Sequence, residues 1–167
     1  EVEVWRARGV GGTNRFFSMG SSHLSSHISE FPSGTFKKAH RHGPAAHLIT
    51  LDGSGYTLEW NTGKELIEFP WKDGTCYTAL NSFWHQHFNP GDKPGRYLAI
   101  TNGRYHTGLR ARPAKVEQVG LDQYGDNMNY EEQEDWILEK FQKECAKNGV
   151  TVDDSKMSKK YELSLPP

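Results

Sequence analysis

The chain has 167 residues and a formal net charge of −1. This length accommodates one domain with a substantial core, and the near-neutral charge argues against nucleic acid as an obligate partner. No apolar run approaches the ~20 residues that span a bilayer, so we expect no membrane partner. Two cysteines without CxxC spacing, Cys76 and Cys145, are typical of free thiols in the cytoplasm.

Seventeen glycines, eight prolines and 12% aromatic residues favour a turn-rich β-protein. Residues 1–22 open with an alternating pattern and continue into a glycine-rich segment, which predicts an arm with a short edge strand and a loop. The chain begins at Glu1 rather than Met and shows no signal-peptide pattern, which suggests a trimmed chain or a piece of a longer one. His23–Phe31 is the next predicted strand. Its His23 and His27 lie opposite the apolar side, so we expect them at solvent or at the rim of the site.

Three histidines, His40, His42 and His47, lie within eight residues of the stretch from Gly34 to Gly53. Side chains two apart on a strand share a face, so Phe36 is predicted to line up with His40 and His42. Histidines that share a face with core residues suggest metal ligands.

Gly43-Pro44 then interrupts the strand, because proline fixes φ and removes a donor. Beyond it, His47 shares a face with Ile49 and Leu51, so we expect His47 to point inward. Lys38 lies on the same predicted face as His40 and must reach past the rim or pair with another group.

A second histidine-rich strand, Phe83–Asn89, places His85 and His87 on one face and Trp84 and Phe88 on the other. A lone histidine in a β-protein is usually a hydrogen-bonded core or surface residue. Five on two such strands are hard to bury without a metal, because each buried ring nitrogen needs a partner. We therefore expect one divalent transition metal per chain. The aromatic face indicates a covered surface, buried in a homodimer or under a segment of the same chain.

The remaining strands are predicted from turn signals. Residues 47–52 and 55–60 form a predicted hairpin around Asp52–Gly55. Further strands are expected at residues 65–69, 75–80 and 96–101, with a turn at residues 70–74 and another at 90–95. About eight strands at this spacing suit a jelly roll.

After Arg112-Pro113 the predicted strands end, and the sequence pattern becomes that of a helix followed by a polar tail. Asn129–Glu132 is a capping box, and apolar residues recur every four positions at Ile137, Phe141 and Cys145. This predicts a helix over about 130–148 that ends at Asn148-Gly149 and packs on the barrel or on a partner subunit. The polar tail, residues 151–167, is predicted to be loosely held.

The chain resembles a cupin. The first cupin motif, G-x5-H-x-H-x3,4-E-x6-G, is matched by Gly34, His40 and His42, with His47 where the family usually has Glu. Counting back from Gly53 would instead put that position at Ala46. The second motif, G-x5-P-x-G-x2-H-x3-N, is matched at its glycine, histidine and asparagine, although its proline and glycine are replaced; the residues concerned are Gly74, Leu80, Ser82, His85 and Asn89.

The resemblance implies an all-β protein, a double-stranded β-helix or jelly-roll barrel, over residues 23–112 with a metal inside. Residues 1–22 would be an N-terminal arm, and residues 113–167 a C-terminal extension with the helix. The expected metal ligands are His40, His42, His47 and His85. His85 is favoured over His87 because the second motif places its ligand three residues before Asn. In addition, His40 and His42 must already tilt toward the ion to share it, and a second tilted pair, His85 and His87, would leave little room for substrate at the metal. His87 is then expected beside the metal as a catalytic acid or base.

An all-imidazole shell is neutral, so a bound divalent metal keeps its full charge and favours an anionic ligand such as an enolate, a catecholate or a carboxylate. Iron(II) with open positions would suit dioxygen activation, whereas zinc would act as a Lewis acid. The leading hypothesis is a non-haem iron dioxygenase acting on a small enolic, phenolic or carboxylate substrate. The alternatives are a zinc or manganese lyase, isomerase or cyclase, and a non-catalytic small-molecule-binding protein with a structural metal. Nickel and copper also stay open as the metal.

Overall fold

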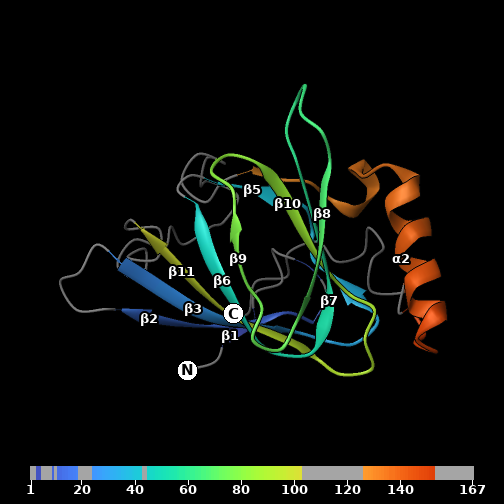
Figure 1. The fold of residues 1–167 in the computed structure, drawn as a ribbon, viewed down its shortest axis with the longest axis horizontal. Helices are drawn as coiled ribbons and strands as arrows, with labels where there is room; N and C mark the ends of the chain where they lie inside the picture. Colours follow the sequence, from blue (N-terminus) through green and yellow to red (C-terminus); the bar gives the residue numbers. More distant parts are fainter. Residues whose placement is uncertain are drawn as a thin grey trace, which may run out of the picture.

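Two antiparallel sheets pack face to face, and one helix covers the outer side of the second sheet (Figure 1). The computed structural model describes residues 3–4, 9, 11–18, 24–42, 45–102 and 126–152. No helix in these ranges is long and apolar enough to cross a bilayer.

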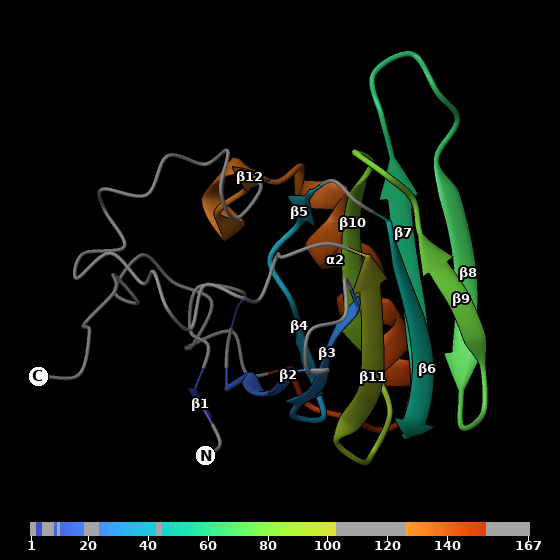
Figure 2. The same cartoon turned by 90° about the vertical axis from the view of Figure 1, so that its left-hand side faces the viewer.

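The first sheet has six strands, in the order β1 (Glu3–Val4), β2 (Thr13–Ser18), β3 (Leu24–Phe31), β11 (Gly95–Asn102), β6 (Ala46–Asp52) and β9 (Cys76–Ala79). The second runs in the order β12 (Asp126–Asn127), β5 (His40–Arg41), β10 (Trp84–Asn89), β7 (Ser54–Trp60) and β8 (Ile67–Lys72), and β4 (Thr35–Phe36) also pairs with β10. From β3 to β11 the chain passes repeatedly from one sheet to the other, which is the jelly-roll topology predicted from the sequence. The fold prediction is confirmed. In Figures 1 and 2 the turn between β7 and β8 projects beyond the barrel.

Two hydrophobic layers hold these elements together. The layer between the sheets contains Phe31, Leu48, Trp71 and Tyr97. The layer between the second sheet and the helix contains Phe36, Tyr56, Leu58, Phe88, Ile137, Phe141 and Cys145. Each large apolar side chain buried in this way contributes about 1.5–3 kcal/mol.

The predicted helix is present as α2 (Asp135–Lys147), and it buries the three predicted residues Ile137, Phe141 and Cys145. Gly149 has φ +66°, the left-handed conformation expected just beyond a helix end. The capping box does not cap α2, however. It caps a separate 3-10 turn, η4 (Tyr130–Glu132), in which the Asn129 N–H donates to Glu132 Oε2 at 2.6 Å.

The aromatic face that was expected to be covered is covered in cis. Phe88 is fully buried, and its ring lies 5.8 Å from that of Phe141 in α2. Trp84 is half-buried beside Trp60. The burial of Phe88 under α2 therefore removes one reason to expect a dimer through the second sheet.

The predicted hairpin of residues 47–52 and 55–60 is wrong. Strands β6 and β7 are consecutive in the chain but belong to different sheets, so the segment between them is a corner. Gly53 makes that corner with φ +88°, and a Cβ there would lie 2.8 Å from the carbonyl oxygen of Pro94. Only glycine fits this backbone without displacing it.

Two further segments differ from the predicted secondary structure. The arm predicted for residues 1–22 contributes β2 to the first sheet, paired with β3 along its length. Pro70 and Trp71 lie within β8, where a turn was predicted; β8 is an edge strand, which tolerates proline. The tail beyond Val152, the boundary at Arg112-Pro113 and His23 lie outside the described residues.

Candidate metal centre

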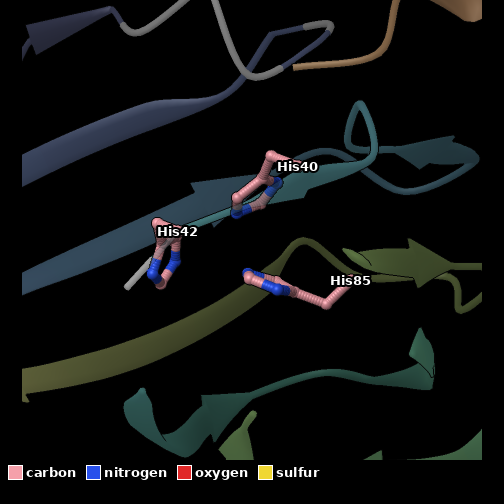
Figure 3. A group of neighbouring side chains, drawn as sticks. All are labelled: His40, His42 and His85. Carbon is pink, nitrogen blue, oxygen red and sulfur yellow. The ribbon is translucent and has the colours of Figure 1, made fainter. Parts of the chain in front are cut away.

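Three histidine side chains from two adjacent strands converge inside the barrel (Figure 3). His40 lies on β5, His42 follows it, and His85 lies on β10 in register with His40. The ring centroids of His40 and His42 lie 4.2 and 4.9 Å from that of His85. One ligand atom from each residue lies within 4.8 Å of the other two, so small rotations would give the about 2.0–2.1 Å bonds of an imidazole to a transition metal.

Backbone carbonyls orient two of these rings. The Nδ1 atom of His40 lies 3.0 Å from the carbonyl oxygen of Lys38, and that of His85 lies 3.1 Å from the carbonyl oxygen of Phe83. A carbonyl only accepts, so each Nδ1 must carry the proton and donate it. In the neutral ring the Nε2 atom then keeps its lone pair, which is the state that a metal ligand requires.

The group of three consists of imidazoles alone. Within the described ranges no Asp, Glu or Cys joins His40, His42 and His85 at ligand distance. His40 and His85 are buried and His42 is half-buried. Three protein ligands leave further positions for water or substrate, the arrangement of a catalytic rather than a closed structural site. The donor set therefore fits a divalent transition metal.

His47 is not brought to this group. It is exposed on the outer face of β6, where its Nδ1 lies 2.9 Å from Thr78 Oγ1. The predicted face of β6 is wrong by one residue, because Ala46, Leu48 and Thr50 point inward and are buried.

The predicted alignment of Phe36 with His40 and His42 is also wrong. Residues 38–39 between β4 and β5 are not in a strand, so the alternation does not carry through them. Phe36 packs under α2, and Lys37 rather than Lys38 points into the barrel. Lys38 pairs outside it, with Asn129 Oδ1 at 3.0 Å.

His87 is buried beside the group of three without joining it. Its ring centroid lies 5.7 Å from that of His85 and 6.1 Å from that of His40. Its Nδ1 lies 2.9 Å from Thr57 Oγ1 and 3.4 Å from the Tyr77 hydroxyl. Hydroxyls both donate and accept, so these contacts fix the ring position without fixing which nitrogen carries the proton.

The barrel interior also holds polar residues for which the sequence predicted no role. Glu59 is 1% exposed and lies on β7 directly opposite His85, and burial raises the pKa of its carboxyl to about 7. Burial also raises the pKa of the Tyr77 hydroxyl, which therefore stays protonated. The sequence pattern that could have identified Glu59 as an interior residue is the alternation along β7, in which Thr57 and Glu59 share one face and Tyr56, Leu58 and Trp60 share the other.

No protein-family profile matches the chain. A gentisate 1,2-dioxygenase from Haloferax sp is 31% identical over a 127-residue alignment, and the match covers 68% of this chain and 35% of that protein. Among solved structures, an oxalate decarboxylase mutant from Bacillus subtilis has a TM-score of 0.53 at 16% identity and covers 56% of this chain and 26% of its own. The Lactobacillus farciminis oxalate decarboxylase in its formate complex has a TM-score of 0.54 at 17% identity and covers 62% of this chain and 31% of its own.

The chain is a cupin by fold. It spans about a third of the length of the gentisate dioxygenase and about a quarter of the Bacillus subtilis decarboxylase. The Bacillus subtilis oxalate decarboxylase has Mn(II) centres.

Two departures from the cupin motifs have visible consequences in the structure. Ser82, at the position of the second motif's glycine, has φ 61°, a left-handed conformation that costs a residue with a Cβ about 1–2 kcal/mol. Its N–H donates to the carbonyl oxygen of His42 at 2.9 Å, so this turn also holds a ligand strand. At the glutamate position of the first motif, the residue that points inward is Ala46, so this position supplies no carboxylate to the group of three.

Asn89, the last residue of the second motif, has a structural role in this cupin. Its Nδ2 donates to the carbonyl oxygens of Pro32 at 3.1 Å and Lys93 at 2.8 Å. Its Oδ1 accepts from the Gly91 N–H at 3.1 Å. These bonds fasten the β10–β11 turn to the end of β3.

Proposed function

We propose that this cupin is a metal-dependent enzyme and that its reaction is the dioxygenation of a small enolic, phenolic or carboxylate substrate. The observation that carries the proposal is the convergence of three imidazoles that no carboxylate of the described residues joins. The similarity to a gentisate 1,2-dioxygenase, over 68% of the chain, supports this chemistry. Gentisate, a dihydroxylated aromatic acid, is therefore the first candidate substrate.

The metal would be held by His40, His42 and His85. Divalent iron bound there would supply open coordination positions for a substrate oxygen and for dioxygen. The neutral ligands leave its charge uncompensated, which favours a substrate that binds as an anion.

His87 is the proposed acid or base. It lies beside the ligands, with its ring held by Thr57 and Tyr77, so it can hydrogen-bond a substrate hydroxyl and accept its proton. The apolar layer of Phe31, Leu48 and Tyr97 lines the same interior and excludes water from it.

A manganese or zinc lyase is the second candidate. It is favoured by the oxalate decarboxylases that share this fold, one of which has Mn(II) centres. Fold alone does not transfer a reaction, so the two candidates must be separated by oxygen consumption.

The test uses the full chain stripped of metal and reloaded without oxygen with Fe(II), Mn(II) or Zn(II). For a dioxygenase we expect the Fe(II) protein to consume one O₂ for each gentisate and to need no external reductant, because both oxygen atoms enter the product. The His85→Ala variant should lose this activity, and the matched variant His47→Ala, changed at an exposed histidine, should keep it. Release of CO₂ from oxalate without net O₂ consumption would instead support the lyase. If the metal-loaded protein binds gentisate or oxalate but converts neither of them, the result would favour a non-catalytic binding protein.

A further inference from the structure

Lys37 places an ammonium group inside the barrel. The residue is 4% exposed. Its Nζ donates to Ser29 Oγ and, at 2.9 Å, to the hydroxyl of Tyr97. The same atom lies 4.8 Å from the centroid of the Tyr97 ring and 5.3 Å from that of Phe31.

None of these partners carries a negative charge. Within the described part of the chain, no Asp or Glu forms an ion pair with Lys37. A buried ammonium without a counter-charge is costly, because hydroxyls and ring faces replace only part of its hydration. An ammonium has three donors, and the two hydroxyls take two of them. Among the described residues, one donor of the ammonium has no partner and its charge has no counter-charge, so a guest could supply both.

The ammonium shares the interior with the candidate metal centre. The backbone N–H of Lys37 donates to the carbonyl oxygen of His87 at 2.9 Å, which ties it to the strand that carries His85. The Tyr97 ring, which Lys37 contacts, lies 5.3 Å from the ring of His87. The ring of His87 in turn lies 5.7 Å from that of His85. Ring contacts through Tyr97 and His87 therefore connect the ammonium to the ring of His85.

We propose that Lys37 binds the carboxylate of an organic acid whose other end reaches the three-histidine group. Ser29 and Tyr97 hold the ammonium in place, and the carboxylate supplies the missing counter-charge. This assignment rests on the proposed function and names the residue that would select acids over neutral analogues. The competing interpretation is a structural lysine that serves only to join β3, β4 and β11.

The two interpretations differ in the ligand-free protein. If Lys37 is an anion-binding residue, its charge is uncompensated in the ligand-free protein. Replacing it with an apolar side chain of similar length removes that charge, so Lys37→Met should melt at the same or a higher temperature than the wild type. If Lys37 is structural, the same change breaks two buried hydrogen bonds and lowers the melting temperature. The variant Lys64→Met, changed at an exposed lysine in the β7–β8 turn, is the matched control.

Binding is measured on the Zn(II)-loaded full chain without oxygen, so no turnover is needed. The probes are gentisate and hydroquinone, which differ only by the carboxylate, together with benzoate and benzamide. The wild type and Lys64→Met should bind each acid at least about tenfold more tightly than its neutral partner. Lys37→Met should reduce that preference to less than about threefold while its affinity for hydroquinone stays unchanged.

A preference that persists in Lys37→Met, or a wild type that shows none, overturns the proposal. If Lys37→Met does not fold, Lys37→Gln, which keeps a polar group near Ser29 and Tyr97, replaces it with the same expected loss. Failure of the dioxygenase assay would leave this result standing, because affinity for zinc-loaded protein does not depend on oxygen chemistry.

Discussion

Glu59 and His85 are directly paired across the antiparallel strands β7 and β10. The Oε2 atom of Glu59 accepts from the N–H of Leu80 at 3.3 Å, and Oε1 has no partner among the described residues. Burial raises the pKa of this carboxyl from its ordinary 4.5 to about 7. The second sheet thus carries a buried carboxyl with a raised pKa opposite a predicted metal ligand.

The first prediction is that Glu59 makes the metal-free protein less stable as the pH rises. Between pH 4.5 and 7 the native protein holds a proton that the unfolded chain releases. The stabilisation is therefore fully present below pH 4.5 and is lost as the pH rises through 7. One pKa unit corresponds to about 1.4 kcal/mol. The free energy of unfolding of the wild type should therefore fall by on the order of 1–3 kcal/mol over this pH range, and that of Glu59→Gln should not show this fall. Urea titrations of both proteins at pH 5, 6, 7 and 8 measure it, and parallel profiles would contradict the prediction.

The second prediction assigns the metal ligands. His40→Ala and His85→Ala should each retain less than about 0.1 equivalent of metal, because two remaining imidazoles bind weakly. Elemental analysis of untagged protein after reloading gives the result. The controls are His47→Ala, changed on the outer face of β6, and Glu59→Gln, changed opposite His85; both should keep close to one equivalent.

His87→Ala separates the ligand from its neighbour. We expect this variant to keep its metal and to lose activity or substrate affinity, since His87 lies beside the three converging rings rather than among them. Loss of metal in His87→Ala with retention in His85→Ala would reverse the assignment. Loss of metal in both variants would mean that His87 is a metal ligand in addition to His40, His42 and His85.

The sequence predicted the strands and the histidine positions more successfully than the faces of those strands. Turn residues marked most strand ends, and the motif spacing singled out His40, His42 and His85. Alternation failed at residues 38–39, where an irregular segment changes the face, so Lys37 rather than Lys38 points inward. It failed again after Gly43-Pro44, where Ala46 rather than His47 points inward. Period-2 reasoning holds within a strand and is lost across each interruption.

Pairing between strands was beyond the sequence patterns for a different reason. A turn such as Asp52–Gly55 is compatible both with a hairpin and with a corner between sheets. Which one forms depends on where β6 and β7 find partners, and these are β11 and β9 for the first and β10 and β8 for the second. For the same reason Glu59 could not be placed opposite His85 before the register was known.

The third prediction concerns the homodimer. The second sheet is covered by α2, so we expect association through the outer face of the first sheet. There Leu98 lies in register with Ile28 on one side and Ile49 on the other, and none of the three is buried. Sedimentation equilibrium at tens of micromolar should give a dimer for the wild type and for Thr62→Glu, and a monomer for Leu98→Glu. A monomeric wild type of 19.0 kDa would contradict it.

The last prediction is that α2 stabilises the sheet that carries the metal ligands. Phe141 is 0% exposed, and its ring lies 4.9 Å from that of Phe36 and 5.8 Å from that of Phe88. These two partners are the chain neighbours of Lys37 and His87. Phe141→Ala removes a buried aromatic ring and should lower the free energy of unfolding by about 3–5 kcal/mol.

The control for Phe141 is Trp136→Ala on the same helix. Trp136 is 39% exposed, so its removal should cost less than about 1 kcal/mol. Both variants should still bind metal when folded, because α2 contributes no ligand to the group of three. Urea unfolding followed by tryptophan fluorescence, with metal content measured on the same samples, provides the comparison. Equal losses of stability in the two variants would mean that the helix is held by its exposed side and that Phe141 does not anchor it.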